Sequence, residues 1–537
     1  MNELTKKLSK ILRMNLAKDF TSVSYAIMKD QKLIAADAVG TNGSRDNAVS
    51  TINDTYNVAS VSKVICALAA MKLVEQGKLD LDEPVYKYLP RFKMLDERYK
   101  KITTRQCLSH TSGLPGTQWK GFSVTDVTED NYYDVVYEYM EHNYLKAEPG
   151  EYAVYCNDGF TLAEMLIAQI SGMKYSKFCE KYITEPVGAK TTQTSDLLNG
   201  ENTLTKEKNK PYELLYIQGG AGYTTSMIDL CKIDVNETIL RLFATAMLEE
   251  GINIYTKHSQ IPQEMTDKYA GKYIIPSGIL NAHMYGAIMH ITQDTTRKES
   301  RGVYKNLKFN GTVFEGENNQ TFYFEEYNDE IYLMTNFRGK NIPLAQKAKN
   351  RKPISQAWEN RIKKEYICIS STPYDLVIHE LMTGFKLEKL EGIEGILISC
   401  FSGLPDDDVY GVFEASVAPI DDNKATGFVN TPSNASRDLV TLCFEIHDDI
   451  EYCHASSYLY RDTESLPIYN KQGFHQDKKI NSVYKIENEL KELPEIPNGR
   501  RLLVLKKDLS VDYDSLYEKE FKGAKEGYIS FIWYLNN

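Results

Sequence analysis

A serine and a lysine stand three residues apart in the segment 57–63, as Ser60 and Lys63. Residues with this spacing are neighbours on the surface of a helix, so the Lys63 amine can lie against the Ser60 hydroxyl and share its proton. The apolar run over residues 64–71 predicts a buried helix that would hold both groups rigidly. Together these residues could make a nucleophilic serine.

The Ser-x-x-Lys spacing does not identify a site by itself, because it recurs at Ser171 with Lys174 and at Ser482 with Lys485. Ser171 falls at the polar end of a predicted helix, and Ser482 lies in a charged stretch. Ser60 opens a long apolar helix, and this context favours it as the nucleophile.

A second set of candidate groups, Tyr155 and Asn157, lies far downstream. Side chains two positions apart on an extended loop point the same way. Tyr155 could take the proton of Ser60 if the Lys63 ammonium stabilises its phenolate, and the Asn157 amide could bind a substrate carbonyl. The alternative is a tyrosine packed on the core beside a helix-capping asparagine, since the same Tyr-x-Asn spacing occurs twice more in the chain.

Further motifs follow in a definite order along the chain. They are residues 57–63, residues 107–115 (Cys-Leu-Ser-His-Thr-Ser-Gly-Leu-Pro), Pro149-Gly150, Tyr155-Cys156-Asn157 and residues 219–230 (Gly-Gly-Ala-Gly-Tyr-Thr-Thr-Ser-Met-Ile-Asp-Leu). This order resembles the serine β-lactamase and penicillin-binding-protein-like family, in its class C, D-aminopeptidase and carboxylesterase branch. The resemblance spans roughly residues 20–340. It implies an α+β, β-lactamase-like transpeptidase fold, with an antiparallel sheet flanked by helices and an all-helical lobe.

The resemblance also implies roles for single residues: an acylated nucleophile, its activating amine, a base and a substrate hydrogen-bonder, carried by Ser60, Lys63, Tyr155 and Asn157. A structural role is expected for His110, and Gly220 and Gly222 are expected to permit a tight turn at the edge of the cleft. A serine, an amine and a phenol form an acyl-transfer set without a metal, so neither a metal nor a cofactor is expected.

The family usually places a His or Lys, any residue and then Gly on a strand beside the nucleophile. The best alignment puts Phe309, Asn310 and Gly311 there as substrate-binding residues, without the cation. In relatives the cation helps to bind a substrate carboxylate, so its loss argues against carboxypeptidase or strong β-lactamase action. Lys308 could replace it only through a one-residue slip, which would point it to the opposite face of the strand.

An alternative assignment comes from residues 267–273, which resemble the opening of the β-barrel modules that follow the catalytic domain in some relatives. If a barrel begins there, residues 309–311 belong to it. The catalytic sheet would then lack its flanking strand. The oxyanion hole, which needs a backbone N–H from that strand beside that of Ser60, would be incomplete.

The predicted elements divide the chain into two parts. Strand hairpins are predicted at residues 22–39 and 321–336, and Thr161, with Glu164 three residues later, predicts a helix start by its capping-box spacing. A helix over residues 354–366 is expected to end the first part. We therefore expect a β-lactamase-like serine hydrolase domain over residues 1–366, with a possible barrel module from about 262, and a β-rich C-terminal domain of unknown role over residues 367–537.

The composition is that of a soluble globular protein. The 537 residues are 42% hydrophobic and 26% charged, enough for about two to three domains. Lys and Arg number 63 against 74 Asp and Glu, a net charge of −11, and the chain has no long basic block, so nucleic acid is not an expected partner. We find no secretory signal or membrane span, which predicts a cytoplasmic protein. The sequence leaves the oligomeric state open.

Two functional hypotheses follow. The first is a serine hydrolase that forms an acyl-enzyme on Ser60 and cleaves a small amide, a D-amino-acid-containing peptide or an ester, with a small molecule or short peptide as its partner. The second is a catalytically weak β-lactamase-like binding or regulatory protein. Phe309 favours the second hypothesis, while the intact set of four polar residues favours the first.

Overall fold

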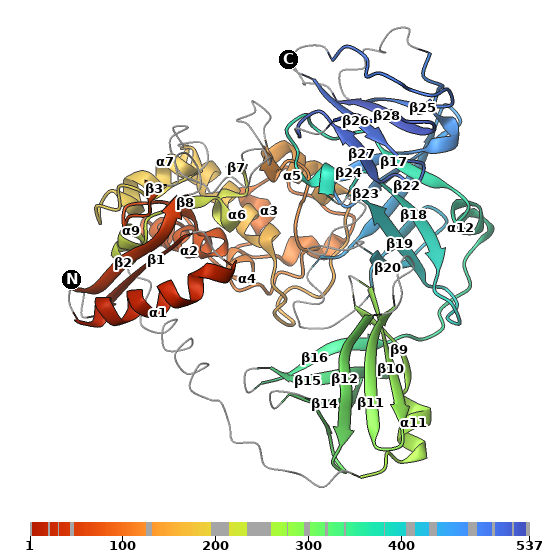
Figure 1. The fold of residues 1–537 in the computed structure, drawn as a ribbon, viewed down its shortest axis with the longest axis horizontal. Helices are drawn as coiled ribbons and strands as arrows, with labels where there is room; N and C mark the ends of the chain where they lie inside the picture. Colours follow the sequence, from red (N-terminus) through yellow and green to blue (C-terminus); the bar gives the residue numbers. More distant parts are fainter. Residues whose placement is uncertain are drawn as a thin grey trace.

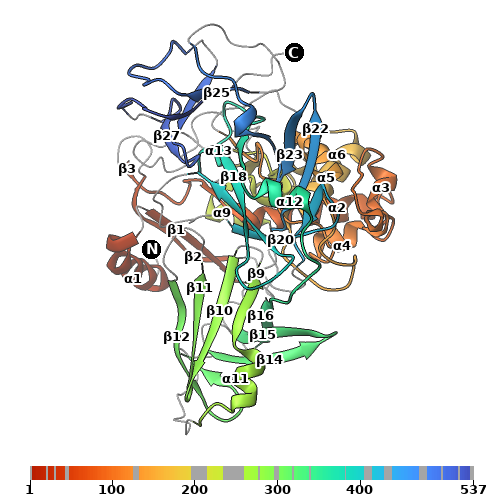
Figure 2. The same cartoon turned by 90° about the vertical axis from the view of Figure 1, so that its right-hand side faces the viewer.

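The computed structural model contains a helical lobe with several small sheets, then two closed β-barrels and a terminal sheet (Figure 1). In both views the first barrel and the terminal sheet lie at opposite ends of the molecule, with the second barrel between them (Figures 1 and 2). The structure describes residues 3–19, 22–29, 32–42, 48–124, 132–194, 214–233, 259–275, 278–294, 301–316, 320–337, 340–380, 382–403, 414–428, 438–470, 481–496, 500–517 and 520–532.

The N-terminal sheet is a hairpin of two long strands. β1 (Ser22–Lys29) pairs antiparallel with β2 (Lys32–Asn42), which confirms the hairpin predicted from the sequence. β3 (Ala48–Val49) extends the sheet beyond β2, and α1 (Glu3–Asp19) packs along β2. Among the described residues, β2 is the one strand hydrogen-bonded to β1.

The helical lobe is built around two buried helices, α2 (Ser62–Glu75) and α6 (Asn157–Ser171). Side chains of both helices share one apolar core, and small residues such as Cys66 let them approach closely. The capping-box start predicted at Thr161 is wrong, because burial of the first turn carries α6 back to Asn157. The Thr161 hydroxyl donates instead to the Asn157 carbonyl, four residues earlier, at 3.4 Å.

Shorter elements complete this half of the molecule and position the loops around α2 and α6. They are α3 (Val85–Tyr88), α4 (Thr104–Leu108), α5 (Tyr132–Glu141), α7 (Tyr175–Cys179), α8 (Gln218–Ala221), α9 (Met227–Lys232), β4 (Tyr56–Asn57), β5 (Ser123–Val124), β6 (Gln193–Thr194), β7 (Leu214–Leu215) and β8 (Tyr223–Thr225).

The first barrel follows α11 (Gln263–Tyr269) and closes β9 against both β10 and β16. Its interior is filled by aliphatic side chains together with aromatic ones such as Phe309 and Phe322. In the hairpin between β14 and β15, Asn328 and Asp329 have φ values of 50° and 62°, as a type I′ turn requires, which confirms the second predicted hairpin. The strands are β9 (Gly271–Ile275), β10 (Gly278–Tyr285), β11 (Ile288–Asp294), β12 (Arg301–Phe309), β13 (Phe314–Glu315), β14 (Thr321–Tyr327), β15 (Glu330–Phe337) and β16 (Lys340–Lys347).

The second barrel runs from β17 to β24, and β17 pairs with both β18 and β24. Its strands are β17 (Glu365–Cys368), β18 (Gly384–Lys389), β19 (Leu397–Ser402), β20 (Glu414–Pro419), β21 (Lys424–Thr426), β22 (Thr441–His447), β23 (Ile450–Ala455) and β24 (Tyr458–Asp462), and α13 (Val377–Glu380) lies between β17 and β18.

The helix predicted over residues 354–366 is shorter in the structure, as α12 (Gln356–Arg361). It ends early because the chain enters β17 at Glu365. Trp358 of α12 is fully buried in the core of the second barrel, so this helix packs on that barrel. We propose that the chain divides between β16 and α12, in place of the boundary predicted at 366.

The terminal sheet has the strand order β25 (Ser482–Ile486), β28 (Gly527–Ile532), β26 (Arg501–Leu505) and β27 (Val511–Asp514). Arg501 and Asp514 form an ion pair with side chains only 2% and 0% exposed. The Arg501 guanidinium also donates to the backbone carbonyl of Asp375 at 2.5 Å, which ties the sheet to the second barrel. Within the described part of the chain, every helix is too short or too polar to cross a bilayer.

Candidate active site

Ser60 lies in a strained turn at the start of α2. The 3₁₀ turn Ala59–Val61 precedes the helix, and Ala59 has a φ of 42°, a left-handed conformation that costs an L-residue about 1–2 kcal/mol. The Asn57 side chain holds this conformation by accepting the Ala59 N–H at 2.7 Å. As a result, the Ser60 side chain is exposed while Lys63, one turn later, is buried.

Lys63 is 7% exposed and makes three hydrogen bonds. Its Nζ donates to the Ser60 Oγ at 3.2 Å, to the Asn157 Oδ1 at 2.8 Å and to the Gly220 carbonyl at 2.6 Å. An ammonium has three N–H donors and no acceptor, so these three oxygens satisfy the charged form of the side chain. The Tyr155 ring lies 4.8 Å from Nζ and adds a cation–π contact.

Tyr155 lies directly against the nucleophile, with its Oη 2.5 Å from the Ser60 Oγ. The His110 ring packs on the Tyr155 ring with centroids 4.5 Å apart. The Nδ1 of His110 accepts the Cys156 N–H at 3.1 Å, and its carbonyl accepts the Val154 N–H at 2.9 Å. His110 therefore holds the backbone on both sides of Tyr155, and its proximity to the phenol makes it part of the site's framework.

Asn157 is oriented by two different partners. Its Oδ1 faces the Lys63 ammonium, and its Nδ2 donates to the Thr117 Oγ1 at 3.2 Å. The next residue, Asp158, accepts the backbone N–H groups of Gly116 at 3.1 Å and Gln118 at 2.7 Å. Burial raises the pKa of Asp158 to about 7, against the two backbone N–H groups, which lower it.

Thr117 and Asp158 were missed by sequence reasoning. Asp158 directly follows Asn157 in the first helical turn, where acidic residues are common for local reasons. Thr117 lies just beyond the motif that ends at Pro115, and only its tertiary contact with Asn157 distinguishes it.

The glycines near residue 220 are needed for close packing. A Cβ on Gly219 would lie 3.0 Å from the Cys66 Sγ, and one on Gly222 would lie 2.7 Å from a backbone oxygen. The Gly219 N–H also donates to the buried Glu164 carboxylate at 2.6 Å. This packing, in place of the tight turn expected at the cleft edge, brings the Gly220 carbonyl to Lys63.

Phe309, Asn310 and Gly311 are not brought to Ser60. Phe309 ends β12 and is buried in the core of the first barrel. The Asn310 Oδ1 accepts two backbone N–H groups of its own turn, and Gly311 has a φ of 103° that the turn requires. The alignment of these residues with the strand beside the nucleophile is therefore corrected: they form a barrel hairpin, as in the alternative assignment.

Sequence relatives match part of the chain. The protein flp of Staphylococcus aureus strain N315 is 27% identical over 188 residues, which cover 35% of this chain and 37% of flp. The D-alanyl-D-alanine-carboxypeptidase/endopeptidase AmpH of Escherichia coli K12 is 30% identical over 148 residues, 27% of this chain and 38% of AmpH. The chain thus spans well under half the length of both curated relatives.

Solved structures are also similar. The D-amino acid amidase from Ochrobactrum anthropi SV3 is 18% identical with a TM-score of 0.38, covering 65% of this chain and 92% of its own. The octameric penicillin-binding protein homologue from Pyrococcus abyssi is 18% identical with a TM-score of 0.35, covering 86% of this chain and all of its own. The family model of the β-lactamases matches residues 5–288, more than half of the chain. This chain, with its α+β catalytic lobe and β-rich C-terminal region, therefore belongs to the β-lactamase family.

Proposed function

We propose that the protein is a serine hydrolase that forms an acyl-enzyme on Ser60 and cleaves a small amide, a D-amino-acid-containing peptide or an ester. One observation carries the proposal: the Ser60 Oγ lies 2.5 Å from the Tyr155 Oη and 3.2 Å from the Lys63 Nζ. The similarity to AmpH, a D-alanyl-D-alanine-carboxypeptidase/endopeptidase, supports an amide or peptide substrate.

The hydrogen bonds around Lys63 support Tyr155 as the base. Three oxygens lie within hydrogen-bond distance of the Lys63 Nζ, an arrangement that suits an ammonium, and an ammonium has no lone pair for the Ser60 proton. Tyr155, whose Oη lies 2.5 Å from the Ser60 Oγ, is then the group that takes this proton.

The reaction then follows as two acyl transfers. The Ser60 Oγ gives its proton to Tyr155 and attacks the substrate carbonyl carbon, whose π electrons move to the oxygen. The carbonyl re-forms as the bond to the leaving amine or alcohol breaks, and Tyr155 returns the proton to that group. A water molecule, deprotonated by Tyr155, attacks the acyl-enzyme in the same way and releases the acid with Ser60 restored.

A second candidate function, a catalytically weak binding or regulatory protein, is favoured by the position of Phe309 in the first barrel. An oxyanion hole needs a second backbone N–H, from a strand beside the nucleophile, in addition to the N–H of Ser60. Residues 309–311 do not supply this N–H, because they lie in the first barrel. Among the described residues, the strand β1 pairs with β2 alone, so no flanking strand supplies it there either. An incomplete oxyanion hole would slow acylation by about 10²–10³-fold.

The test is intact mass spectrometry after exposure to a fluorophosphonate and, separately, to a penicillin. We expect a phosphonate adduct that Ser60→Ala abolishes and Ser62→Ala retains, because Ser62 faces the Tyr223 N–H and not the site. A phosphonate adduct without a penicillin adduct favours an amidase or esterase. The hydrolase proposal fails if the folded protein gains no adduct from either reagent, and the binding-protein candidate then stands.

A further inference from the structure

Residues 115–124, here called the bridging loop, run between the candidate active site and the second barrel. The loop follows the motif that contains His110 and ends in β5. One side of the loop contacts the start of α6, and the other contacts strands and turns that lie more than two hundred residues later in the chain.

On the site side, the bridging loop is bonded to the first turn of α6. The Asn157 Nδ2 donates to the Thr117 Oγ1 at 3.2 Å. Asp158, which is fully buried, accepts the N–H groups of Gly116 and Gln118, and its own N–H donates to the Gly116 carbonyl at 3.0 Å. One of these four hydrogen bonds joins Thr117 itself to Asn157, and the other three join its two neighbours to Asp158. Together they hold Thr117 against Asn157.

On the far side, three hydrogen bonds join the backbone of the same loop to the second barrel. The bonds run from the Trp119 N–H to the Ser457 Oγ at 3.0 Å, from the Leu439 N–H to the Pro115 carbonyl at 3.0 Å, and from the Leu376 N–H to the Ser123 carbonyl at 3.1 Å. The side chains of Trp119 and Phe122 pack against the barrel core. The loop is therefore held along its whole length.

Asp375 anchors the end of the loop. It is 0% exposed, and its carboxylate accepts the Tyr458 hydroxyl at 2.8 Å and the Val377 N–H at 3.0 Å. Its backbone forms an antiparallel bridge with Val124 at the end of the bridging loop, and burial raises the pKa of its carboxyl group while the Gly121 N–H of the loop lowers it. A buried carboxylate needs such partners, so Asp375 couples the loop backbone to the barrel.

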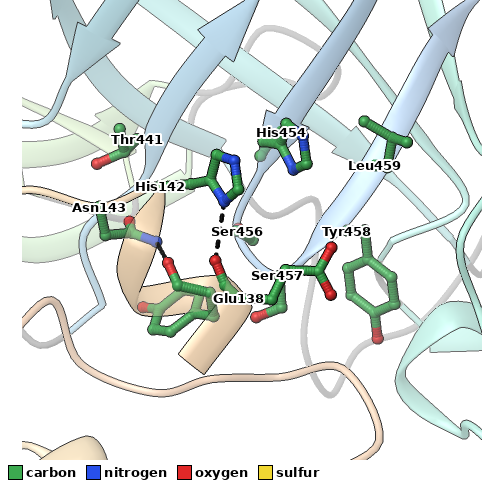
Figure 3. Close-up of a pocket in the computed structure, with 11 residues that line it drawn as sticks. Glu138, His142, Asn143, Thr441, His454, Ser456, Ser457, Tyr458 and Leu459 are labelled. Atoms are coloured by element: carbon green, nitrogen blue, oxygen red, sulfur yellow. Dashed lines mark hydrogen bonds between the residues drawn. The ribbon is translucent and has the colours of Figure 1, made fainter. Parts of the chain in front are cut away.

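The contact surface continues beside the loop, where the end of α5 meets β22 to β24 (Figure 3). The His142 ring stacks on the His454 ring with centroids 3.8 Å apart and an interplanar angle of 9°. Ser457 lies in the turn between β23 and β24, close to these residues (Figure 3). The barrel therefore meets the lobe around a pocket that residues of α5 and of the barrel line, and Ser457, which is bonded to the loop, is one of these residues (Figure 3).

We propose that Ser457 and Asp375 of the second barrel are positioning residues for the acyl-transfer site, an inference that rests on the proposed function. They hold the bridging loop so that the Thr117 hydroxyl fixes the Asn157 amide with its oxygen toward Lys63. If the loop moves, the Asn157 amide loses its contact with Thr117, and its oxygen can move away from the ammonium. Lys63 then loses one acceptor, and the charge arrangement that favours Tyr155 as the base is weakened.

The experiment measures the rate constant of fluorophosphonate labelling, and its pH profile, for variants of the full chain. Thr117→Val removes the acceptor of the Asn157 amide, and we expect labelling to slow about tenfold, with Thr117→Ser restoring it. We also expect the pH profile of labelling to differ from that of the wild type, because the charged and polar groups around Ser60 are rearranged. Ser457→Ala should slow labelling about threefold and should change the pH profile in the same way as Thr117→Val.

The matched control is Ser399→Ala in the same barrel. The Ser399 Oγ donates to the Ala415 carbonyl, away from the bridging loop, so this variant loses a comparable barrel hydrogen bond and should label at the wild-type rate. If Ser457→Ala fails to fold, Tyr458→Phe, which removes the hydroxyl partner of Asp375, tests the inference independently, because it too should slow labelling.

The two proposals fail in different ways. If the wild-type protein is not labelled, the proposed function falls. If the wild type is labelled, and Thr117→Val and Ser457→Ala label at its rate with an unmoved pH profile, the positioning inference is overturned while the proposed function stands.

Discussion

The two barrels share an architecture but differ in how they relate to the candidate active site. Each is a closed sheet of eight antiparallel strands. The core of the first barrel is drawn, in the described part of the chain, from residues 261–345, whereas the core of the second is joined by Trp119 and Phe122 of the bridging loop. Two barrels of the same fold can therefore differ in their relation to the active site. The difference comes from which side chains of the lobe pack into each barrel's core.

The largest expected effect comes from a matched pair of core substitutions, Phe322→Ala in the first barrel and Phe385→Ala in the second. Both side chains are 0% exposed, so each change should lower the free energy of unfolding by about 3–5 kcal/mol. Only Phe385→Ala should also slow fluorophosphonate labelling of the folded protein. Chemical denaturation and labelling kinetics check the pair, and equal slowing in both variants would contradict the comparison.

A pH dependence should distinguish the second barrel from the first. Burial, together with the neighbouring His142, lowers the pKa of His454 from 6.5 to about 4, while the facing carboxylates of Glu445 and Glu138 act in the opposite direction. Because the unfolded chain binds this proton first, the stabilisation is fully present above pH 6.5 and is lost as the pH falls toward 4, by up to about 1.4 kcal/mol per pH unit.

Denaturation of wild type and His454→Gln across this range measures the effect. In His454→Gln, the free energy of unfolding should no longer fall between pH 6.5 and 4 by this amount. The control is His283→Gln in the first barrel, where His283 contacts the Thr292 hydroxyl, and this variant should show the same fall as the wild type. Parallel slopes for wild type and His454→Gln would refute the prediction.

A smaller effect is expected from removing one hydroxyl in each barrel. Tyr458→Phe leaves the buried Asp375 carboxylate without its hydroxyl partner and should cost about 1–3 kcal/mol, whereas Tyr273→Phe removes a bond to the Tyr269 carbonyl and should cost about 1 kcal/mol. We expect slower labelling for Tyr458→Phe alone. Slower labelling for Tyr273→Phe would show that the first barrel also supports the site.

The smallest effect is expected at exposed ion pairs. Lys268 with Glu326 in the first barrel, and Lys389 with Glu359 on the second, are about half exposed and screened by water and salt. Lys268→Met and Lys389→Met should leave both the unfolding midpoint and the labelling rate at wild-type values. A clear shift in the unfolding midpoint of either variant would mean that the exposed ion pairs contribute to the stability of the barrels.

Local patterns were enough to predict several elements. The hairpins of β1 with β2 and of β14 with β15 follow from alternating side chains and polar turns. The grouping of Ser60, Lys63 and Tyr155 followed from the order of motifs along the chain, and the structure places both Lys63 and Tyr155 within hydrogen-bond reach of Ser60.

Other features could not be read locally. A strand that ends in Asn310-Gly311 looks the same in a catalytic sheet and in a barrel, because the turn chemistry is identical and only tertiary pairing assigns the strand. The helix start at Thr161 was misplaced because burial of the preceding turn outweighs a side-chain cap. Thr117 depends on a contact with Asn157 across 40 residues, which no local spacing encodes.

The bond between Trp119 and Ser457 also sets a time scale. It joins residues 338 positions apart, and a ribosome adding roughly 5–20 residues per second needs about 17–70 seconds to make the intervening chain. For most of that interval the bridging loop of the nascent protein has α6 but not the barrel to hold it. Ser60 is thus made long before this support, and we expect full labelling by a fluorophosphonate only once the second barrel, residues 365–462, has been made and has folded.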